Sequence, residues 1–395
     1  MTLLRSSNDG STSNDDVNSD VEDEEDALLD EETILRFQGV GRLYEQTIST
    51  STSTTTTKTK TPPSLTYTQI LTKLQKSTIA IIGIGGVGSW IAESICRSGI
   101  HNIILVDLDD VCISNTNRQI HATTSNIGKM KINVMKERLL DINPNVNVTC
   151  IHEFITQDNV FDIVETFRSD DNDNTKVDVI IDAIDGNTEK AALIAACCVK
   201  NIPIITCGGA AGRIDPTQIV CQDLSTSVDC KLLFWTKKKL RNEYRLFPNN
   251  DDDTGVTTSA ADAAAWKTNK KKKNKMKKWR IPAIYSLETQ KKLDNDNSND
   301  NDSSSSSFRK CDGGLGTASF VTGTYGMIAA SQAIQMIVNN DFPKPRVIKS
   351  SVEYWNQVHE EKKKEKERQQ QDDNDDDDGS DTQNDILQGI FADLN

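Results

Sequence analysis

Residues 78–88 read TIAIIGIGGVG, and this stretch decides the fold. Five β-prone apolar residues lead into Gly83, Gly85 and Gly88, and a helical pattern begins at Ser89. A Gly-x-Gly-x-x-Gly turn between a strand and a helix is typical of nucleotide-binding folds, because the glycines permit a tight turn and the free N–H groups of the helix start face a phosphate. The stretch predicts a nucleotide-binding domain, and by itself it fits NAD as well as ATP.

The chain after this loop alternates short apolar runs with helical patterns. Such alternation predicts an α/β fold: a Rossmann-like, mostly parallel sheet wrapped by helices over residues 78–207, continued by a smaller C-terminal half. The expected strands are 78–82, 102–106, 146–151, 177–182 and 202–206, and the expected helices lie near 89–98, 129–142, 157–168 and 188–200. Residues 313–338 are a Gly/Ala-rich helical segment that we expect to pack closely on the sheet.

Low-complexity segments interrupt and flank the folded part, which we place at residues 33–345. Apolar residues make up only 36% of the 395, so much of the chain is expected to be unfolded. The segments predicted to be disordered are an acidic leader at 1–32, a Ser/Thr-rich insertion at 49–61, an insertion at 249–307 with a possible strand at 281–286, and a charged, acidic tail at 346–395 that starts with a helix-like run after Ser350.

Composition limits the compartment and the partners. The two acidic ends contribute −11 and −9 to the net charge of −14, so the rest carries +6 and a nucleic-acid partner is not excluded. Nine irregularly spaced cysteines and the lack of a secretory signal favour a reducing compartment. No run approaches the ~18–20 apolar residues that span a bilayer. We therefore expect no membrane insertion and a cytoplasmic protein, with mitochondrial association left open.

Charged residues downstream of the glycine loop favour ATP over NAD. Asp107 ends the second strand about 20 residues after the loop, where a carboxylate grips a ribose hydroxyl in such folds. Splitting ATP requires cations that offset phosphate charge and a carboxylate that holds magnesium. Arg118 and Lys131 are the cations, and Asp185 follows the fourth strand. Taken singly, each is better explained as a surface charge, a solvated helix residue or a helix cap; together they predict an ATP site.

In combination these motifs resemble the ubiquitin-activating-type adenylating superfamily, the ThiF/MoeB group. Within that group the sequence is similar to the tRNA threonylcarbamoyladenosine dehydratases. The resemblance rests on GIGGVG at 83–88, TNRQIHA at 116–122, DAID at 182–185, GGAAGRIDPTQI at 208–219, RKCD at 309–312, RF at 36–37 and RLY at 42–44. It covers the ordered parts of residues 34–48, 66–235 and 308–340.

The resemblance implies an activity in which ATP activates the free carboxylate of threonylcarbamoyladenosine, next to the tRNA anticodon. Internal attack then closes a ring with formal loss of water. The implied nucleotide-binding residues are Gly83, Gly85, Gly86, Gly88, Asp107, Asp109, Asn115 and Gln119; Arg118 and Lys131 would bind phosphates, Asp185 Mg²⁺, and Arg42 the nucleotide of a second copy of the chain. ATP and Mg²⁺, a tRNA substrate and a homodimer are thus implied, and a sulfur-transfer partner is possible.

Two features have alternative interpretations. Cys311 matches a family cysteine and is either a reactive thiol or an incidental one, because ring closure within one substrate needs no covalent carrier. The Lys-rich stretch 270–278, with Trp266 and Trp279 nearby, either binds tRNA phosphates and stacks on bases or is a solvated charge run in an insertion.

Three other functions compete with this interpretation. The nearest is adenylation of the C-terminus of a ubiquitin-like or sulfur-carrier protein; many such enzymes hold zinc with two Cys-x-x-Cys pairs, which are absent here, so no zinc is expected. Retention of Arg118, Lys131 and Asp185 disfavours a non-catalytic binding module, and the same residues disfavour NAD-dependent oxidoreduction. Arg118→Ala is expected to remove turnover and leave folding intact, since it changes a charge and no core group.

Overall fold

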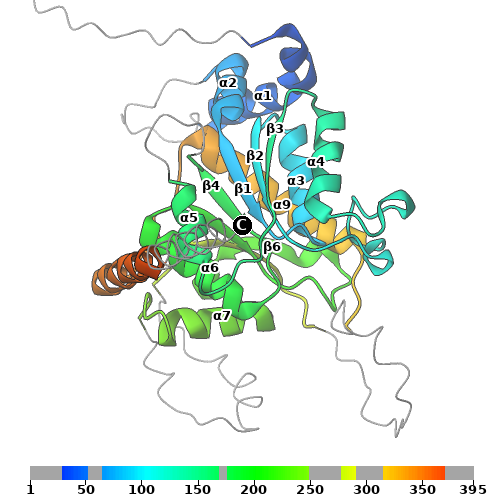
Figure 1. Ribbon diagram of the computed structural model, residues 1–395. Helices are drawn as coiled ribbons and strands as arrows, with labels where there is room; N and C mark the ends of the chain where they lie inside the picture. Colours follow the sequence, from blue (N-terminus) through cyan, green and yellow to red (C-terminus); the bar gives the residue numbers. More distant parts are fainter. Residues whose placement is uncertain (1–28, 52–64, 169–175, 249–276, 291–314, 370–395) are drawn as a thin grey trace, which may run out of the picture.

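The computed structural model describes residues 29–51, 65–168, 176–248, 277–290 and 315–369 (Figure 1). Their strands form a seven-stranded sheet in the order β3-β2-β1-β4-β5-β7-β6. Neighbouring strands are parallel except β6 and β7, which are antiparallel. The strands are β1 Thr78–Ile82, β2 Asn102–Val106, β3 Asn147–Ile151, β4 Val179–Asp182, β5 Ile204–Cys207, β6 Ile219–Asp223 and β7 Pro282–Ser286. The predicted α/β fold with a mostly parallel sheet is confirmed.

Alternate residues of the central strands contribute to two separate hydrophobic cores. In β1, Ile79 and Ile81 belong to one core while Ala80 and Ile82 belong to the other. A parallel sheet is covered by helices on both faces, which is why its strands are continuous apolar runs rather than alternating ones. All five residues of β1 and of β2 are buried accordingly.

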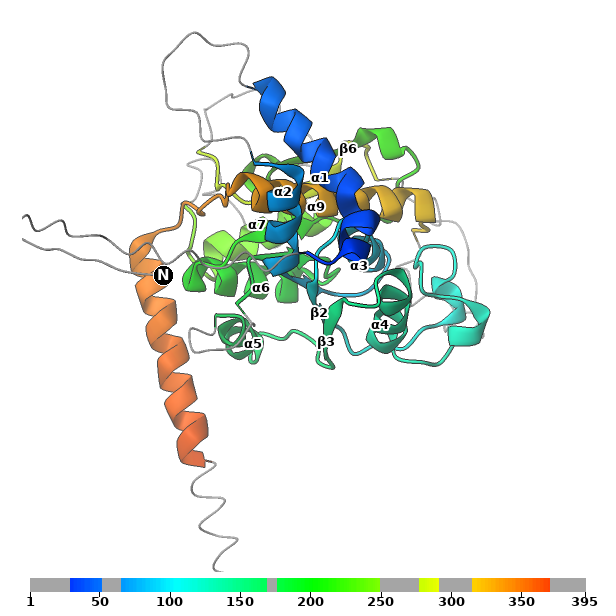
Figure 2. The same ribbon diagram turned by 90° about the horizontal axis from the view of Figure 1, so that it is seen from above.

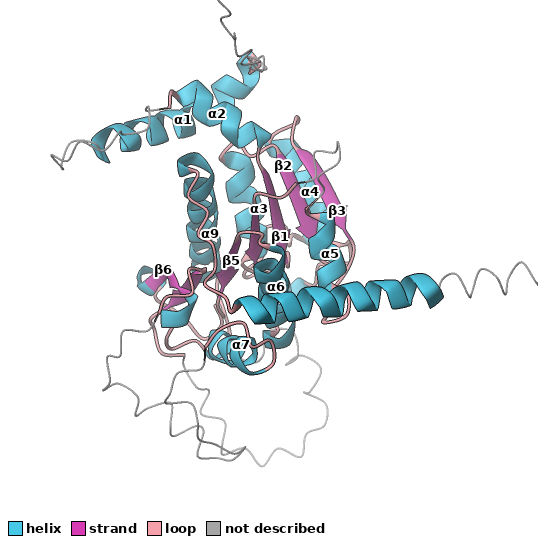
Figure 3. Cartoon of the chain, turned by 90° about the vertical axis from the view of Figure 1, so that its left-hand side faces the viewer, coloured by secondary structure: helices cyan, strands magenta, loops and turns pink. Residues whose placement is uncertain are grey.

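Helices cover both faces of the sheet (Figures 1 and 3). One face carries α3 Gly88–Arg97, α4 Lys131–Ile142 and α9 Ser319–Asn339, and the other carries α5 Val160–Thr166, α6 Asn187–Lys200 and α7 Lys231–Asn242. The segment predicted to pack closely is α9, and Gly326 explains how: a Cβ there would lie 2.6 Å from the Cβ of Trp90 in α3. Glycine therefore lets two helix backbones approach each other.

Two helices precede the sheet, and α1 Glu31–Ser51 crosses α2 Tyr67–Lys76 (Figure 2). The crossing is close because a Cβ on Gly41 would lie only 2.7 Å from the Tyr67 carbonyl. Thr66 caps α2 in a reciprocal pair of hydrogen bonds with Gln69, the capping-box arrangement that satisfies free N–H groups. Short 3₁₀ helices complete the fold: η1 Ile113–Asn115, η2 Thr124–Asn126, η3 Pro216–Gln218 and η4 Leu224–Thr226.

Strand β7 corrects the predicted insertion at 249–307. Residues 277–290 are ordered, and β7 lies between β5 and β6 with Ala283, Ile284 and Tyr285 fully buried. The Tyr285 hydroxyl donates to Gln222 Oε1 at 2.9 Å, which ties β7 to β6. The possible strand at 281–286 is thus an internal strand of the sheet; residues 249–276 and 291–314 lie outside the described residues.

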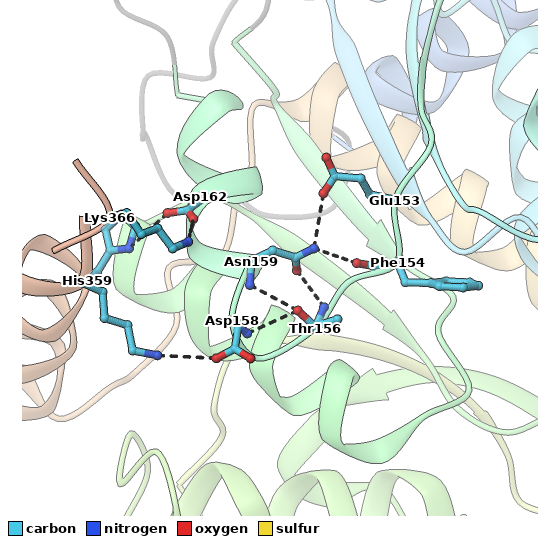
Figure 4. Close-up of polar contacts among 9 residues, drawn as sticks. Glu153, Phe154, Thr156, Asp158, Asn159, Asp162, His359 and Lys366 are labelled. Atoms are coloured by element: carbon cyan, nitrogen blue, oxygen red, sulfur yellow. Dashed lines mark hydrogen bonds and ion pairs between the residues drawn. The ribbon is translucent and has the colours of Figure 1, made fainter. Parts of the chain in front are cut away.

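A C-terminal helix at residues 349–369 corrects the tail predicted to be disordered from 346. It packs on α5 and on the segment that follows α7 through residues spaced three or four apart: Val352, Trp355, His359, Lys362 and Lys366. The Trp355 indole donates to the Tyr244 carbonyl at 2.8 Å, and Lys366 and Lys362 pair with Asp162 and Asp158 at 2.6 and 3.7 Å (Figure 4). Apolar packing and charge pairing on one stripe therefore hold this helix in place.

The helices of the described segments are all too short or too polar to cross a membrane.

Candidate active site

The glycine loop follows β1 and is shaped by two close backbone approaches. Gly83 has a φ of +90°, and a Cβ on Gly88 would lie 1.8 Å from the Gly83 carbonyl oxygen. These two positions therefore need glycine for the turn itself. Gly85 is different, because only Gln119 Nε2, at 4.0 Å, would lie within reach of a Cβ there. Open space at Gly85, directly before α3, fits a phosphate that approaches the backbone.

Asp107 connects the end of β2 to this loop. Its Oδ2 accepts a hydrogen bond from the Ile84 N–H at 2.6 Å, and its Oδ1 accepts one from the Asp109 N–H at 2.8 Å. Burial raises the pKa of this carboxyl, and the nearby Lys131 acts in the opposite direction. Each oxygen keeps a lone pair, so Asp107 can hold the loop and also accept from a ribose hydroxyl.

Lys131 begins α4 and pairs with Asp109 across the same edge of the sheet. The distance between Lys131 Nζ and Asp109 Oδ2 is 2.6 Å, and the lysine is 7% exposed against 52% for the aspartate. The Lys131 N–H donates to the Asp109 carbonyl at 2.9 Å, and the Val111 carbonyl accepts from the Gly128 N–H at 2.8 Å. The loop 108–130 is therefore folded back on α4, and this places the lysine ammonium beside Asp107.

Arg118 lies in the 3₁₀-rich loop after β2, and its backbone is fixed by two helices. Its carbonyl accepts from Trp90 Nε1 of α3 at 3.0 Å and from Thr322 Oγ1 of α9 at 3.1 Å. The guanidinium donates to the Ser114 carbonyl at 2.6 Å, and the residue is only 9% exposed. A Cβ on Gly86 would lie 3.5 Å from the Cγ and Cδ atoms of Arg118, so the aliphatic stem of this residue runs alongside the glycine loop.

Asn115 and Gln119 complete this side of the site. Asn115 Oδ1 accepts from the Cys112 N–H at 3.0 Å, so the asparagine shapes the loop itself. Gln119 is 6% exposed, and within the described segments its Oε1 has no hydrogen-bond donor. A buried acceptor without a donor is costly. Its position beside Gly85 fits a ligand hydroxyl or amino group as the missing donor.

The turn after β4 brings Asp185 to the same edge. The two aspartates of DAID have different environments, because Asp182 is fully buried and Asp185 is exposed. Asp182 Oδ1 accepts from the Ile184 N–H at 3.0 Å, which fixes the turn. A Cβ on Gly83 would lie 3.1 Å from the Ala183 carbonyl, so the turn lies against the glycine loop. The Arg118 stem and the DAID turn thus lie against the glycine loop, and Asp107 connects that loop to the Lys131–Asp109 pair.

Comparison with known proteins identifies the family. The sequence profile of the ThiF family matches residues 61–374. The chain belongs to the ThiF family. It is 37% identical over 260 residues to the tRNA threonylcarbamoyladenosine dehydratase of Escherichia coli (strain K12), which covers 66% of this chain and 85% of that one.

Solved structures agree with this assignment. The crystal structure of the E. coli tRNA N6-threonylcarbamoyladenosine dehydratase in complex with AMP matches with a TM-score of 0.58 at 31% identity, over 79% of this chain and 97% of that chain. Among the sequence relatives, the sulfur carrier protein ThiS adenylyltransferase of E. coli is 34% identical over 134 residues, which cover 34% of this chain and 49% of that one. The resemblance inferred from the motifs is confirmed.

Sequence reasoning missed a buried charge cluster beneath the ThiF-family DAID turn. Lys190, in the first turn of α6, places its Nζ 2.7 Å from Asp182 Oδ2, and both side chains are 0% exposed. Thr206 of β5 donates to the same carboxylate oxygen at 2.6 Å. The cluster joins β4, β5 and α6 at the strand end that leads into the turn with Asp185. The sequence did contain one indication of this cluster, because Lys190 directly precedes the apolar, Ala-rich run of α6.

His121 is a second residue of the site region that was missed. It is 1% exposed, and neither ring nitrogen has a hydrogen-bond partner among the described residues. Burial, reinforced by Lys131 and Arg138, lowers the pKa of this imidazole to about 4. Unfolding therefore takes up a proton between pH 6.5 and about 4, so His121 destabilises the fold increasingly as the pH falls through this window.

His121→Met is expected to weaken the acid sensitivity of the fold. The free energy of unfolding that wild type loses between pH 7 and pH 5 should shrink by roughly 2 kcal/mol in the variant. Urea unfolding at the two pH values measures this difference. The control is His152→Met, because His152 is exposed. Equal pH dependence of His121→Met and wild type would contradict the assignment.

One predicted site residue, Arg42, is not brought to the glycine loop. Arg42 is exposed on α1 and lies 5.6 Å from the centre of the Tyr67 ring, at the start of α2. Since α2 leads into the amino end of β1, α1 and α2 lie at the end of the sheet opposite the loop (Figure 1). Cys311 lies outside the described residues.

Trp279 does not have the predicted role in base stacking. Its ring is 4% exposed and stacks on Phe247 with ring centroids 3.9 Å apart. An indole covered in this way has no free face for a base. Trp266 and residues 270–276 of the Lys-rich stretch lie outside the described residues, whereas Lys277 and Lys278 are described and exposed.

Proposed function

We propose that this ThiF-family chain catalyses the ATP-dependent dehydration of threonylcarbamoyladenosine in tRNA, next to the anticodon. The observation that carries the proposal is the arrangement around the glycine loop: the Arg118 stem and the turn that bears Asp185 lie against it, and Asp107 connects it to Lys131. Relatives named tRNA threonylcarbamoyladenosine dehydratase support the substrate. A carboxylate is a poor electrophile until one of its oxygens can leave, and ATP supplies the adenylyl group that makes it a leaving group.

The residues of the site divide into three roles. Gly85, Gly86 and the start of α3 bind phosphate through backbone N–H groups, while Asp107 and Gln119 hold the ribose and the rest of the nucleoside. Arg118 and Lys131 offset the charge that develops on the phosphates as pyrophosphate leaves. Internal attack by the substrate then releases AMP and closes the ring. Asp109 and Asn115 shape the loop that carries these cations.

Asp185 fits a role in holding Mg²⁺. Magnesium is usually bound by one or two carboxylates together with substrate phosphates and water, rather than by a cage of protein ligands. Asp185 is an exposed carboxylate beside the phosphate-binding loop, whereas Asp182 is committed to Lys190 and Thr206. In the described part of the chain, no three His, Cys, Asp or Glu side chains cluster as metal ligands. The site therefore supports binding of Mg²⁺ by one carboxylate together with the phosphates of the substrate.

The position of Arg42 supports a homodimer as part of the proposal. Arg42 lies on α1 beside the start of α2, at the amino end of β1, whereas the glycine loop follows the carboxyl end of that strand. A role of Arg42 at a nucleotide therefore implies a second copy of the chain. We place the enzyme in the cytoplasm, where tRNA and ATP are both available.

A direct assay tests the proposed reaction. The purified full chain, incubated with ATP, Mg²⁺ and tRNA carrying threonylcarbamoyladenosine, should yield a nucleoside lighter by one water in mass spectrometry. Matched tRNA without the threonylcarbamoyl group should give neither this product nor AMP. If AMP formation instead requires a small ubiquitin-like or sulfur-carrier protein and tRNA is unchanged, the alternative activity replaces this one.

A further inference from the structure

Helix α7 exposes an aromatic and basic stripe that the nucleotide site does not use. Its buried side includes Leu233 and Leu240, while Lys231, Trp235 and Lys238 are exposed on the opposite side. Trp235 is 43% exposed, and Lys238 Nζ lies 4.9 Å from the centre of an indole ring of this residue. The helix contains no acidic residue. Large exposed aromatic side chains rimmed by charge mark an interaction surface.

The amino end of α7 is tied to the edge of the sheet that carries the active site. Gly209, directly beyond β5, donates its N–H to the Cys230 sulfur at 3.4 Å. Arg213, from the same loop, donates to the Asp229 carbonyl at 2.5 Å, one residue before the helix cap. Strands β4 and β5 are parallel neighbours, so this loop and the Asp185 turn lie at the same edge. A ligand bound along α7 would therefore begin next to the edge of the sheet that carries the active site.

A second basic segment is fixed against the carboxyl end of α7. The buried Trp279 stacks on Phe247, and the guanidinium of Arg241 in α7 lies 5.0 Å from the centre of a Trp279 ring. The N–H groups of Trp279 and Arg280 both donate to the Asp223 carboxylate, at 2.9 and 2.6 Å. Lys277, Lys278 and Arg280, which flank Trp279, are exposed. Trp279 thus anchors the end of the Lys-rich stretch, and the flanking residues Lys277, Lys278 and Arg280 lie next to an anchor that contacts α7.

We propose that the exposed face of α7 and residues 277–280 together form a tRNA-binding surface, in which Trp235 stacks on an unpaired base and the lysines contact phosphates. This inference rests on the proposed function. Base stacking on an aromatic ring and charge pairing with phosphates are the two interactions that hold single-stranded RNA without reading its sequence. A protein partner is less suited to this surface, because lysines are depleted in protein–protein interfaces.

Affinity for tRNA carrying threonylcarbamoyladenosine, measured by filter binding with the full chain, tests the surface. Trp235→Ala should raise the Kd about tenfold. The double variant Lys231→Ala/Lys238→Ala should reduce the slope of log Kd against log salt concentration by about two, one for each lost phosphate contact. The Kd for ATP should stay unchanged in both, which also reports intact folding. Matched controls are Tyr354→Ala and Lys363→Ala/Lys364→Ala, exposed residues of the C-terminal helix.

The outcomes separate the surface from the proposed function. Wild-type tRNA affinity in Trp235→Ala, with the wild-type chain still converting tRNA, would overturn the surface and leave the reaction standing. Loss of heparin binding in Trp235→Ala as large as the loss of tRNA binding would refute base stacking, because heparin has charge and no bases. A wild-type chain that neither binds nor converts modified tRNA would overturn both.

Discussion

Lys190→Met is expected to lower the free energy of unfolding by about 3–5 kcal/mol, because it leaves the Asp182 carboxylate unpaired in the interior. Lys190 and Asp182 are both 0% exposed, and the only other side-chain hydrogen bond to Asp182 comes from Thr206 in the described residues. Methionine has a similar length and no charge, so loss of the pair rather than of volume is tested. Urea unfolding of the full chain at pH 7 measures the effect.

Lys200→Met is the matched control for this prediction. Lys200 lies at the other end of α6 and pairs with Glu165 at 2.6 Å, but Glu165 is 39% exposed and can be solvated when the lysine is removed. A loss of at most about 1 kcal/mol is therefore expected. The double variant Lys190→Met/Asp182→Asn should regain most of the stability, because no charge is left buried. If Lys190→Met and Lys200→Met lose the same free energy of unfolding, burial of the Lys190–Asp182 pair does not increase the cost of breaking it.

The residues around the glycine loop were predictable because their signal is local. The apolar run of β1, the three glycines and the carboxylate of Asp107 follow one another within about 30 residues, and the turn needs those residue types at that spacing. Lys190 was not predictable in this way. Its charge is tolerable only because Asp182 and Thr206 come from two other elements, and a lysine in an isolated helix pattern is more often solvated.

Two ordered segments were predicted only in part, for the same reason. Strand β7 is five residues long and is flanked by low-complexity sequence, and its buried position depends on pairing with β5 and β6, which precede it by more than 50 residues. The helix at 349–369 is rich in Lys and Glu, so composition predicted a solvated tail. The stripe of contact residues that includes Trp355 and His359 can be recognised only when α5 and Tyr244 are placed beside the helix.

The environment of Arg118 changes how its role must be tested. The expectation that Arg118→Ala leaves folding intact is wrong in its premise, because the residue is 9% exposed and its guanidinium donates to the Ser114 carbonyl. Alanine would remove both packing and that hydrogen bond, so lost activity would not separate catalysis from stability. Arg118→Gln keeps part of the stem and an N–H donor, and it removes the charge that we propose offsets the phosphates.

Arg118→Gln is expected to lower kcat for tRNA-dependent AMP release by about 10²–10³-fold, the usual effect of losing one group that stabilises developing charge. The KM for ATP should change much less, because the cation acts mainly as pyrophosphate leaves. Arg97→Gln is the control: Arg97 lies at the far end of α3, is 57% exposed and pairs with Glu93, so kcat should stay within about twofold. If Arg118→Gln turns over at the wild-type rate, Arg118 does not bind the reacting phosphates, and Lys131 alone must offset their charge.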